Sequence, residues 1–378
     1  MSNDKIESVT TRLVAVPLAK PVGWSTLSVT TREYVLVEIT TADGVVGTGF
    51  TLGSRFIGGG QVIQTIVDEV LRPVLLGRDP SEIRALWEDM FFTALLLGRK
   101  GAAMRAISSV DIALWDLLGR RAGLPVCDLL GRYRSRVPAY SSGGYHYAGD
   151  NFAQELEALD AEVSGAVERG FRAVKIKIGR LSVGEDLQRV ERVLDAVNGK
   201  ATVSVDANNA WRSAATAINA LRGLDGLGLD WIEEPLFPDQ LEGCAEIARK
   251  LTTPIAIGEM ENGLRAFQQI IKYGAASILQ ADVTVVGGFS EWMRIAGLAE
   301  ANDVALAPHW VADLHVQVGA VSPHVIGLEY FHSSVGVLNF HELLEDTVQV
   351  EHGELVVPAR SGHGMLFDKK AIERYTVR

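Results

Sequence analysis

Residues 171–178 (FRAVKIKI), 201–206 (ATVSVD) and 229–234 (LDWIEE) are short apolar runs that end in charged side chains. Successive runs of this kind start 22 to 34 residues apart, the length of one strand and one helix. Eight such units predict an α/β fold, a (β/α)8 barrel of modified TIM-like form. The alternative is a doubly wound open sheet, which would need a dinucleotide or phosphate loop after its first strand, and the sequence has none. The other runs lie at 137–142, 254–258, 276–282, 303–307 and 325–330.

The residues before this series predict a smaller unit of strands and helices. Residues 33–50 carry alternating β-branched side chains around Asp43 and Gly44, a pattern typical of a hairpin. Apolar residues then recur with helical spacing, and Gly123 ends the last of these stretches. The predicted helices span 61–75, 81–95 and 102–122.

These patterns divide the chain into three parts. We expect an N-terminal α+β capping domain at residues 1–135 and the catalytic barrel at residues 136–350. Residues 351–378 return to hairpin-like chemistry, and we expect them to pack back on the cap.

Composition excludes several classes of protein. With 36 basic and 47 acidic residues the net charge is −11, which argues against a nucleic-acid partner. Two cysteines, Cys127 and Cys244, allow neither a disulfide framework nor a thiolate zinc cluster. No apolar run is long enough to span a bilayer, and the first residues contain no secretory signal. We therefore expect a soluble, cytoplasmic protein that makes no contact with membranes.

Two local motifs resemble known functional motifs but each lacks an essential part. The glycines between Gly47 and Gly53 follow a hairpin strand and are one residue off a nucleotide-binding pattern, so we interpret them as structural. His341 and Glu342 resemble the start of a zinc-protease helix, but the second histidine is missing.

Active-site groups of barrel enzymes lie at the carboxyl ends of the strands, and here those ends are polar. Lys175 and Lys177 lie on the same face of one strand and should both point into the barrel. Two neighbouring ammonium groups lower each other's pKa, so one of them could act as a general base near neutral pH.

The next three runs end in carboxylates, Asp206, Glu233 and Glu259. Like charges that converge at close range must be protonated or bind a cation. An all-oxygen ligand set indicates a hard cation such as Mg²⁺. Asn208 follows Asp206 by two residues and could line the same site.

The last strands supply a histidine and two further acids. If the strands are neighbours, Asp282 can accept a hydrogen bond from His309 and fix its tautomer. Glu329 would then be either a hydrogen-bond donor, if protonated, or an orienting group. With a lysine on one side and a histidine on the other, the site suits removal of a proton α to a carboxylate. Mg²⁺ and Lys175 would stabilise the enediolate that forms.

In this order, these residues resemble the mandelate racemase subgroup of the enolase superfamily. The resemblance rests on the motifs VKIKIG, VDANNAW, WIEEPL and IAIGE and on the strand-end residues from Asp282 to Glu329. It implies that Asp206, Glu233 and Glu259 bind one Mg²⁺ per subunit. It also implies that Lys177 and His309 are the acid/base catalysts, with Lys175 and Glu329 at the substrate carboxylate.

Most members of the subgroup are acid-sugar dehydratases, and residues 98–125 and 141–144 look similar to the L-talarate/galactarate dehydratases. The resemblance therefore implies a dehydratase acting on a small hydroxy or sugar acid, with a 2-keto-3-deoxy acid as product. A racemase or epimerase using the same two bases is the alternative. Trp24, Tyr145 and His146 depart from the talarate pattern, and we treat them as candidate substrate contacts. The family resemblance also implies a homo-oligomer, commonly an octamer.

Overall fold

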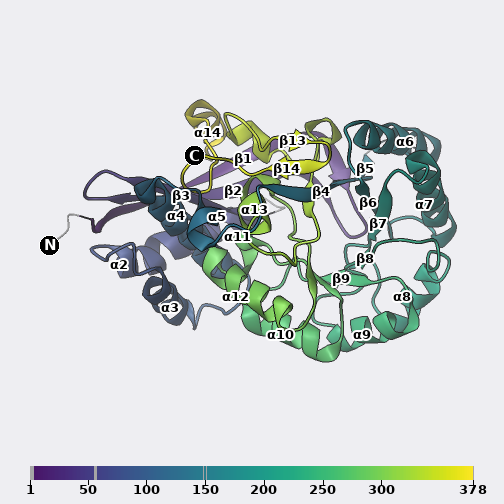
Figure 1. Cartoon of the computed structure of the whole chain (residues 1–378), viewed down its shortest axis with the longest axis horizontal. Helices are drawn as coiled ribbons and strands as arrows, with labels where there is room; N and C mark the ends of the chain where they lie inside the picture. Colours follow the sequence, from purple (N-terminus) through teal and green to yellow (C-terminus); the bar gives the residue numbers. More distant parts are fainter. Residues whose placement is uncertain (1–3, 55–57, 148, 150, 378) are drawn as a thin grey trace.

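The computed structural model describes residues 4–54, 58–147, 149 and 151–377. Figure 1 shows the N-terminal strands and helices at one end of the molecule and a ring of helices around short strands at the other. Within the described ranges, no helix has both the length and the apolar character needed to cross a bilayer.

An antiparallel sheet forms the N-terminal part. Its strand order is β3-β2-β1-β5, and the predicted hairpin is present as β2 and β3. The long strand β1 and its pairing with β2 were not predicted from the sequence. The bounds are β1 (Ile6–Gly23), β2 (Ser28–Thr41), β3 (Val46–Ser54) and β5 (His146–Tyr147).

Helices cover this sheet, and the longest has the predicted bounds. The helix α4 (Ala102–Ala122) ends at Gly123, which adopts the left-handed φ of 67° that favours glycine. Gly47 and Gly49 of β3 lie against α4, where a Cβ would come within 2.2 Å of the carbonyl oxygens of Ala113 and Ser109. These glycines therefore serve close helix packing. The other elements are α1 (Gly59–Thr65), the π-helix η1 (Ile66–Leu71), α2 (Arg72–Leu75), α3 (Ile83–Ala94) and α5 (Val126–Leu130).

Eight parallel strands form the barrel. From β4 to β11 each strand pairs with the next, and β12 pairs with β4. Between β11 and β12 the described residues show only an isolated parallel bridge, from Leu306 to Val325. The strands are β4 (Arg136–Gly143), β6 (Ala173–Lys177), β7 (Thr202–Asp206), β8 (Ile232–Glu233), β9 (Ile255–Ile257), β10 (Ile278–Leu279), β11 (Ala305–Leu306) and β12 (Leu328–Tyr330).

Helices follow the first seven of these strands. Asn151 and Ser182 begin two of them with reciprocal capping boxes. The last strand, β12, differs from the predicted unit, because two 3₁₀ turns and no α-helix lie between it and β13. The elements are α6 (Phe152–Glu168), α7 (Val183–Val197), α8 (Ala214–Leu221), α9 (Leu241–Lys250), α10 (Leu264–Tyr273), α11 (Val283–Val286), α12 (Gly288–Glu300), α13 (Ala312–Gly319), η2 (Ser333–Val335) and η3 (Phe340–Leu343).

The C-terminal segment contacts both parts. Strand β14 (Glu354–Val356), paired with β13 (Val350–Glu351), adds antiparallel to the first half of β4. Helix α14 (Lys369–Tyr375) is followed by a bridge from Thr376 to Val14 of β1. The domain boundaries at residues 135 and 350 stay predictions.

Candidate active site

Three carboxylates converge at the carboxyl ends of neighbouring strands. Asp206 ends β7 and lies beside Glu233 of β8 in register, and Glu259 follows β9. One oxygen of each lies within 4.8 Å of the others, and all three residues are buried. Burial and the charge of Asp206 raise the pKa of Glu233 to about 8. Mutual repulsion and an all-oxygen donor set fit a divalent hard cation, so these residues could hold Mg²⁺.

Two lysines of β6 contact this acidic cluster. Lys177 forms an ion pair with Asp206, and Lys175 lies 2.5 Å from Glu233 and 2.8 Å from Glu329. Burial lowers the pKa of Lys177, but the attraction of Asp206 outweighs burial and raises it above the ordinary value. The sequence-based expectation of a lowered lysine pKa is therefore wrong, because the carboxylates act more strongly than the neighbouring ammonium group.

A histidine and an aspartate form the other side of the site. Nδ1 of His309 lies 2.9 Å from Oδ2 of Asp282, as predicted, and Nε2 lies 3.5 Å from Glu259. Burial lowers the pKa of His309, but Glu259 and Asp282 outweigh it and raise the pKa to about 9. The structure therefore favours a protonated imidazole whose orientation is fixed by Asp282.

Glu329 of β12 is an ionised acceptor. It accepts hydrogen bonds from Ser142 Oγ at 2.7 Å and from the Trp310 backbone N–H at 2.8 Å. Burial raises its pKa, but Lys175, His309 and Lys177 together lower it to about 2. Of the two predicted states of Glu329, the structure therefore favours the orienting carboxylate.

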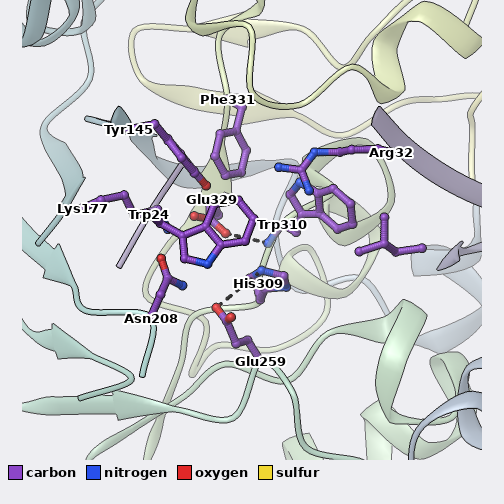
Figure 2. A pocket seen from close by; sticks show the side chains of 11 residues that line it. Trp24, Arg32, Tyr145, Lys177, Asn208, Glu259, His309, Trp310, Glu329 and Phe331 are labelled. Atoms are coloured by element: carbon purple, nitrogen blue, oxygen red, sulfur yellow. Dashed lines mark hydrogen bonds and ion pairs between the residues drawn. The ribbon is translucent and has the colours of Figure 1, made fainter. Parts of the chain in front are cut away.

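Some of these groups line one pocket between the barrel and the cap, which Figure 2 shows. Predicted site residues that line it are Lys177, His309, Glu259, Glu329, Asn208, Trp24 and Tyr145. The other lining residues are Arg32, Leu52, Trp310 and Phe331, none of which we predicted. Trp310 directly follows His309 and could have been named from the sequence. Arg32 and Leu52 lie on cap strands and Phe331 follows β12, and no local sequence pattern marks these three as site residues.

Three of the four candidate substrate contacts, Asn208, Tyr145 and Trp24, line the pocket. Asn208 has a positive φ of 41°, and its Oδ1 is buried with no hydrogen-bond partner among the described residues. The Tyr145 ring lies 4.8 Å from Lys177 Nζ and 6.1 Å from the Trp24 ring.

His146 does not line the pocket. Its Nδ1 lies 3.0 Å from Glu155, and its backbone pairs with Gly23 of β1. It therefore lies in the sheet beside Tyr145, and this position does not support the predicted contact with substrate. Lys175, Asp206, Glu233 and Asp282 are buried behind the lining residues.

Comparisons with known proteins cover both parts of the chain. Residues 6–131 match the family "Mandelate racemase / muconate lactonizing enzyme, N-terminal domain". Residues 158–371 match the family "Enolase C-terminal domain-like".

Individual relatives cover nearly the whole chain. The 3,6-anhydro-alpha-L-galactonate cycloisomerase of Streptomyces coelicolor is 36% identical over 98% of this chain and 99% of its own. The structure of a racemase from Streptomyces coelicolor A3(2) with bound magnesium is similar at 35% identity, covering 98% of this chain and 100% of that one, with a TM-score of 0.89. L-talarate/galactarate dehydratase from Salmonella typhimurium LT2, with Mg and L-lyxarohydroxamate, is similar at 32% identity, covering 100% of this chain and 94% of that one, also with a TM-score of 0.89.

Proposed function

This chain belongs to the mandelate racemase and muconate lactonizing enzyme family of the enolase superfamily, and on that basis we propose that it is a Mg²⁺-dependent acid-sugar dehydratase. The enzyme would remove the proton α to the substrate carboxylate and then eliminate the β-hydroxyl. The enol product would tautomerise to a 2-keto-3-deoxy acid. The supporting observation is that Lys177 and His309 face one pocket from well-separated strands, with Glu259 beside His309 (Figure 2).

The chain's own residues have distinct roles in this proposal. One of Lys177 and His309 takes the α-proton, and the configuration of the substrate decides which. His309, or Lys177 for the opposite configuration, protonates the departing hydroxyl. Asp282 holds the proton on Nδ1 of His309, so that Nε2 serves the pocket.

The remaining residues would hold the cation, orient the carboxylates and shield Lys177. Asp206, Glu233 and Glu259 would hold the cation. When bound, the cation supplies positive charge for the substrate carboxylate and weakens the attraction between Asp206 and Lys177. Lys175 fixes Glu233 and Glu329, both of which it contacts. The Tyr145 ring lies against Lys177, with Trp24 packed on Tyr145, and reduces the access of Lys177 to water.

Two other reactions begin with the same proton transfer. A racemase or epimerase would return the proton to the other face of the α-carbon. A cycloisomerase is favoured by the name of the Streptomyces coelicolor relative, and it would close or open a ring without losing water. Racemisation gives no 3-deoxy product, and ring opening gives one only from a cyclic substrate, so product and substrate form together separate the three reactions.

Proton NMR tests the proposal. The protein would be incubated with Mg²⁺ in D₂O against mono- and dicarboxylic sugar acids and their lactones or anhydro forms. We expect a new 3-deoxy methylene signal with one or more of the open-chain acids. Loss of the α-proton signal without a methylene would contradict dehydration and favour racemisation. A 3-deoxy methylene that forms only from a lactone or anhydro form, by elimination of the ring oxygen, would favour cycloisomerisation. The cytoplasmic location and the homo-oligomer, an octamer by family resemblance, stay predictions.

A further inference from the structure

Arg32 is a buried cation on the wall of the pocket. The residue is 6% exposed and lies on β2 of the cap, paired in register with Val16. Its Nε donates a hydrogen bond to the Val337 carbonyl oxygen at 2.8 Å. Its guanidinium carbon lies 5.2 Å from the centroid of the Trp310 ring. In the part of the chain that the structure describes, neither terminal Nη group has a hydrogen-bond partner and no carboxylate pairs with Arg32.

A buried charge without a counter-ion is costly, which makes this arrangement informative. The other buried cations of the site are paired: Lys175 with Glu233 and Glu329, and Lys177 with Asp206. Arg32 faces the same pocket from the cap, and its charge is available to a ligand.

The geometry of Arg32 indicates the kind of ligand. The Val337 hydrogen bond and the Trp310 ring fix the plane of the guanidinium, and both Nη groups stay available. A planar fork of two N–H donors matches the two oxygens of a carboxylate. A single hydroxyl would engage only part of this fork and would leave the charge unneutralised.

The position of Arg32 indicates which carboxylate it would bind. Figure 2 shows Arg32 beside Trp310, across the pocket from Asn208 and Glu259. A substrate carboxylate bound to a cation at Asp206, Glu233 and Glu259 would lie on the side of Glu259. Arg32 would then meet the far end of the same molecule. We propose that the substrate is a dicarboxylic sugar acid, an aldarate, whose remote carboxylate pairs with Arg32. This inference rests on the proposed function and deepens it.

Matched pairs of substrates test the inference. Galactarate and glucarate each differ from the galactonate or gluconate of the same configuration only at C6, where a carboxylate replaces a hydroxymethyl group. We would measure kcat/KM for each pair with Mg²⁺ in the unaltered protein and in Arg32→Lys and Arg32→Gln. Melting temperatures would show whether the variants are folded.

We expect the unaltered protein to favour the diacid of at least one pair by about a hundredfold or more, since an unmatched buried charge discriminates strongly. In Arg32→Gln the preference for the diacid should fall to about tenfold or less. The preference of Arg32→Lys should lie between those of Arg32→Gln and the unaltered protein. A ratio near one in the unaltered protein, a preference for the monoacid, or an unchanged ratio in Arg32→Gln would overturn the inference. If Arg32→Gln does not fold, the ratios of the unaltered protein and of Arg32→Lys decide.

A binding measurement separates this inference from the proposed function. If no acid is dehydrated, titration calorimetry with Mg²⁺ and the same acids replaces kcat/KM. Preferential binding of the diacid that is lost in Arg32→Gln would support the role of Arg32 while the dehydratase proposal fails. Equal binding of both acids would overturn the inference about Arg32.

Discussion

His309 and Asp282 form a hydrogen-bonded pair at the mouth of the barrel, with 2.9 Å between Nδ1 and Oδ2. An ionised aspartate only accepts hydrogen bonds, so Nδ1 must carry the proton. Nε2 is then the nitrogen that faces the pocket, 3.5 Å from Glu259. The pair thus sets both the orientation and the basicity of the imidazole.

We expect Asp282→Asn to lower kcat about a hundredfold. The anionic Asp282 raises the pKa of His309, so its neutral replacement should move the His309 limb of the pH–rate profile toward lower pH. Asp368 is a matched control, because it also begins a helix, α14, as an N-cap. An unshifted limb in Asp282→Asn, or the same loss in Asp368→Asn, would contradict the assignment.

Glu233 should make the stability of the metal-free protein depend on pH. Its pKa rises from an ordinary 4.5 to about 8 in the folded state, so the folded protein binds more protons between these values. The free energy of unfolding should therefore fall as pH rises through this window. Saturating Mg²⁺ should remove the fall, because the cation stabilises the ionised form.

Thermal melts between pH 4.5 and 8, with and without Mg²⁺, measure this effect. Glu233→Gln should flatten the metal-free profile and reduce the stabilisation by Mg²⁺. Glu242→Gln, at an exposed position on α9, should behave as the unaltered protein. Identical profiles for all three proteins would show that Glu233 does not carry the effect.

Arg189 holds the loop that carries Tyr145. It is 1% exposed, donates to the Gly144 carbonyl oxygen at 2.6 Å and pairs with Glu155 at 3.3 Å. Arg189→Met should cost about 3–5 kcal/mol of unfolding free energy, because it removes one partner of a buried charge pair. Arg192→Met, three residues further on α7, removes an exposed pair with Asp160 and should cost about 1 kcal/mol or less. Chemical denaturation compares the two, and equal costs would be inconsistent with this role.

Gly49 is required by the packing of β3 on α4. A Cβ there would lie 2.0 Å from the Ser109 carbonyl oxygen, so Gly49→Ala should destabilise the protein by about 3 kcal/mol. Gly184 of α7 has nothing within 4 Å of its would-be Cβ, and Gly184→Ala should stabilise by up to about 1 kcal/mol. Denaturation midpoints would test the contrast, and a tolerated alanine at position 49 would refute the packing argument.

The barrel was predictable because its signals are local. Alternation along 171–178 places Lys175 and Lys177 on one face, and the spacing of strand ends brings Asp206 beside Glu233. Neighbouring strands also place His309 beside Asp282, as predicted.

Arg32 and the lysine pKa values were not predictable in this way. Arg32 reaches the pocket through contacts with Val337 and Trp310, about 300 residues away in the sequence, and no local pattern encodes that contact. The pKa of Lys177 depends on the position of one carboxylate oxygen of Asp206, which strand periodicity does not give. His146 looked like a pocket residue because it follows Tyr145, but alternation in β5 turns it toward Glu155.

The central claim is that Lys177 and His309 act on one substrate from two sides. Exchange of the substrate α-proton in D₂O, followed by NMR with Mg²⁺, tests it in Lys177→Met and His309→Asn, with the exposed Lys200→Met as control. We predict that dehydration falls at least about a thousandfold in both variants. Substrates of one configuration should still exchange the α-proton in Lys177→Met and those of the other in His309→Asn, and Lys200→Met should match the unaltered protein. Undiminished dehydration in either variant would contradict the claim.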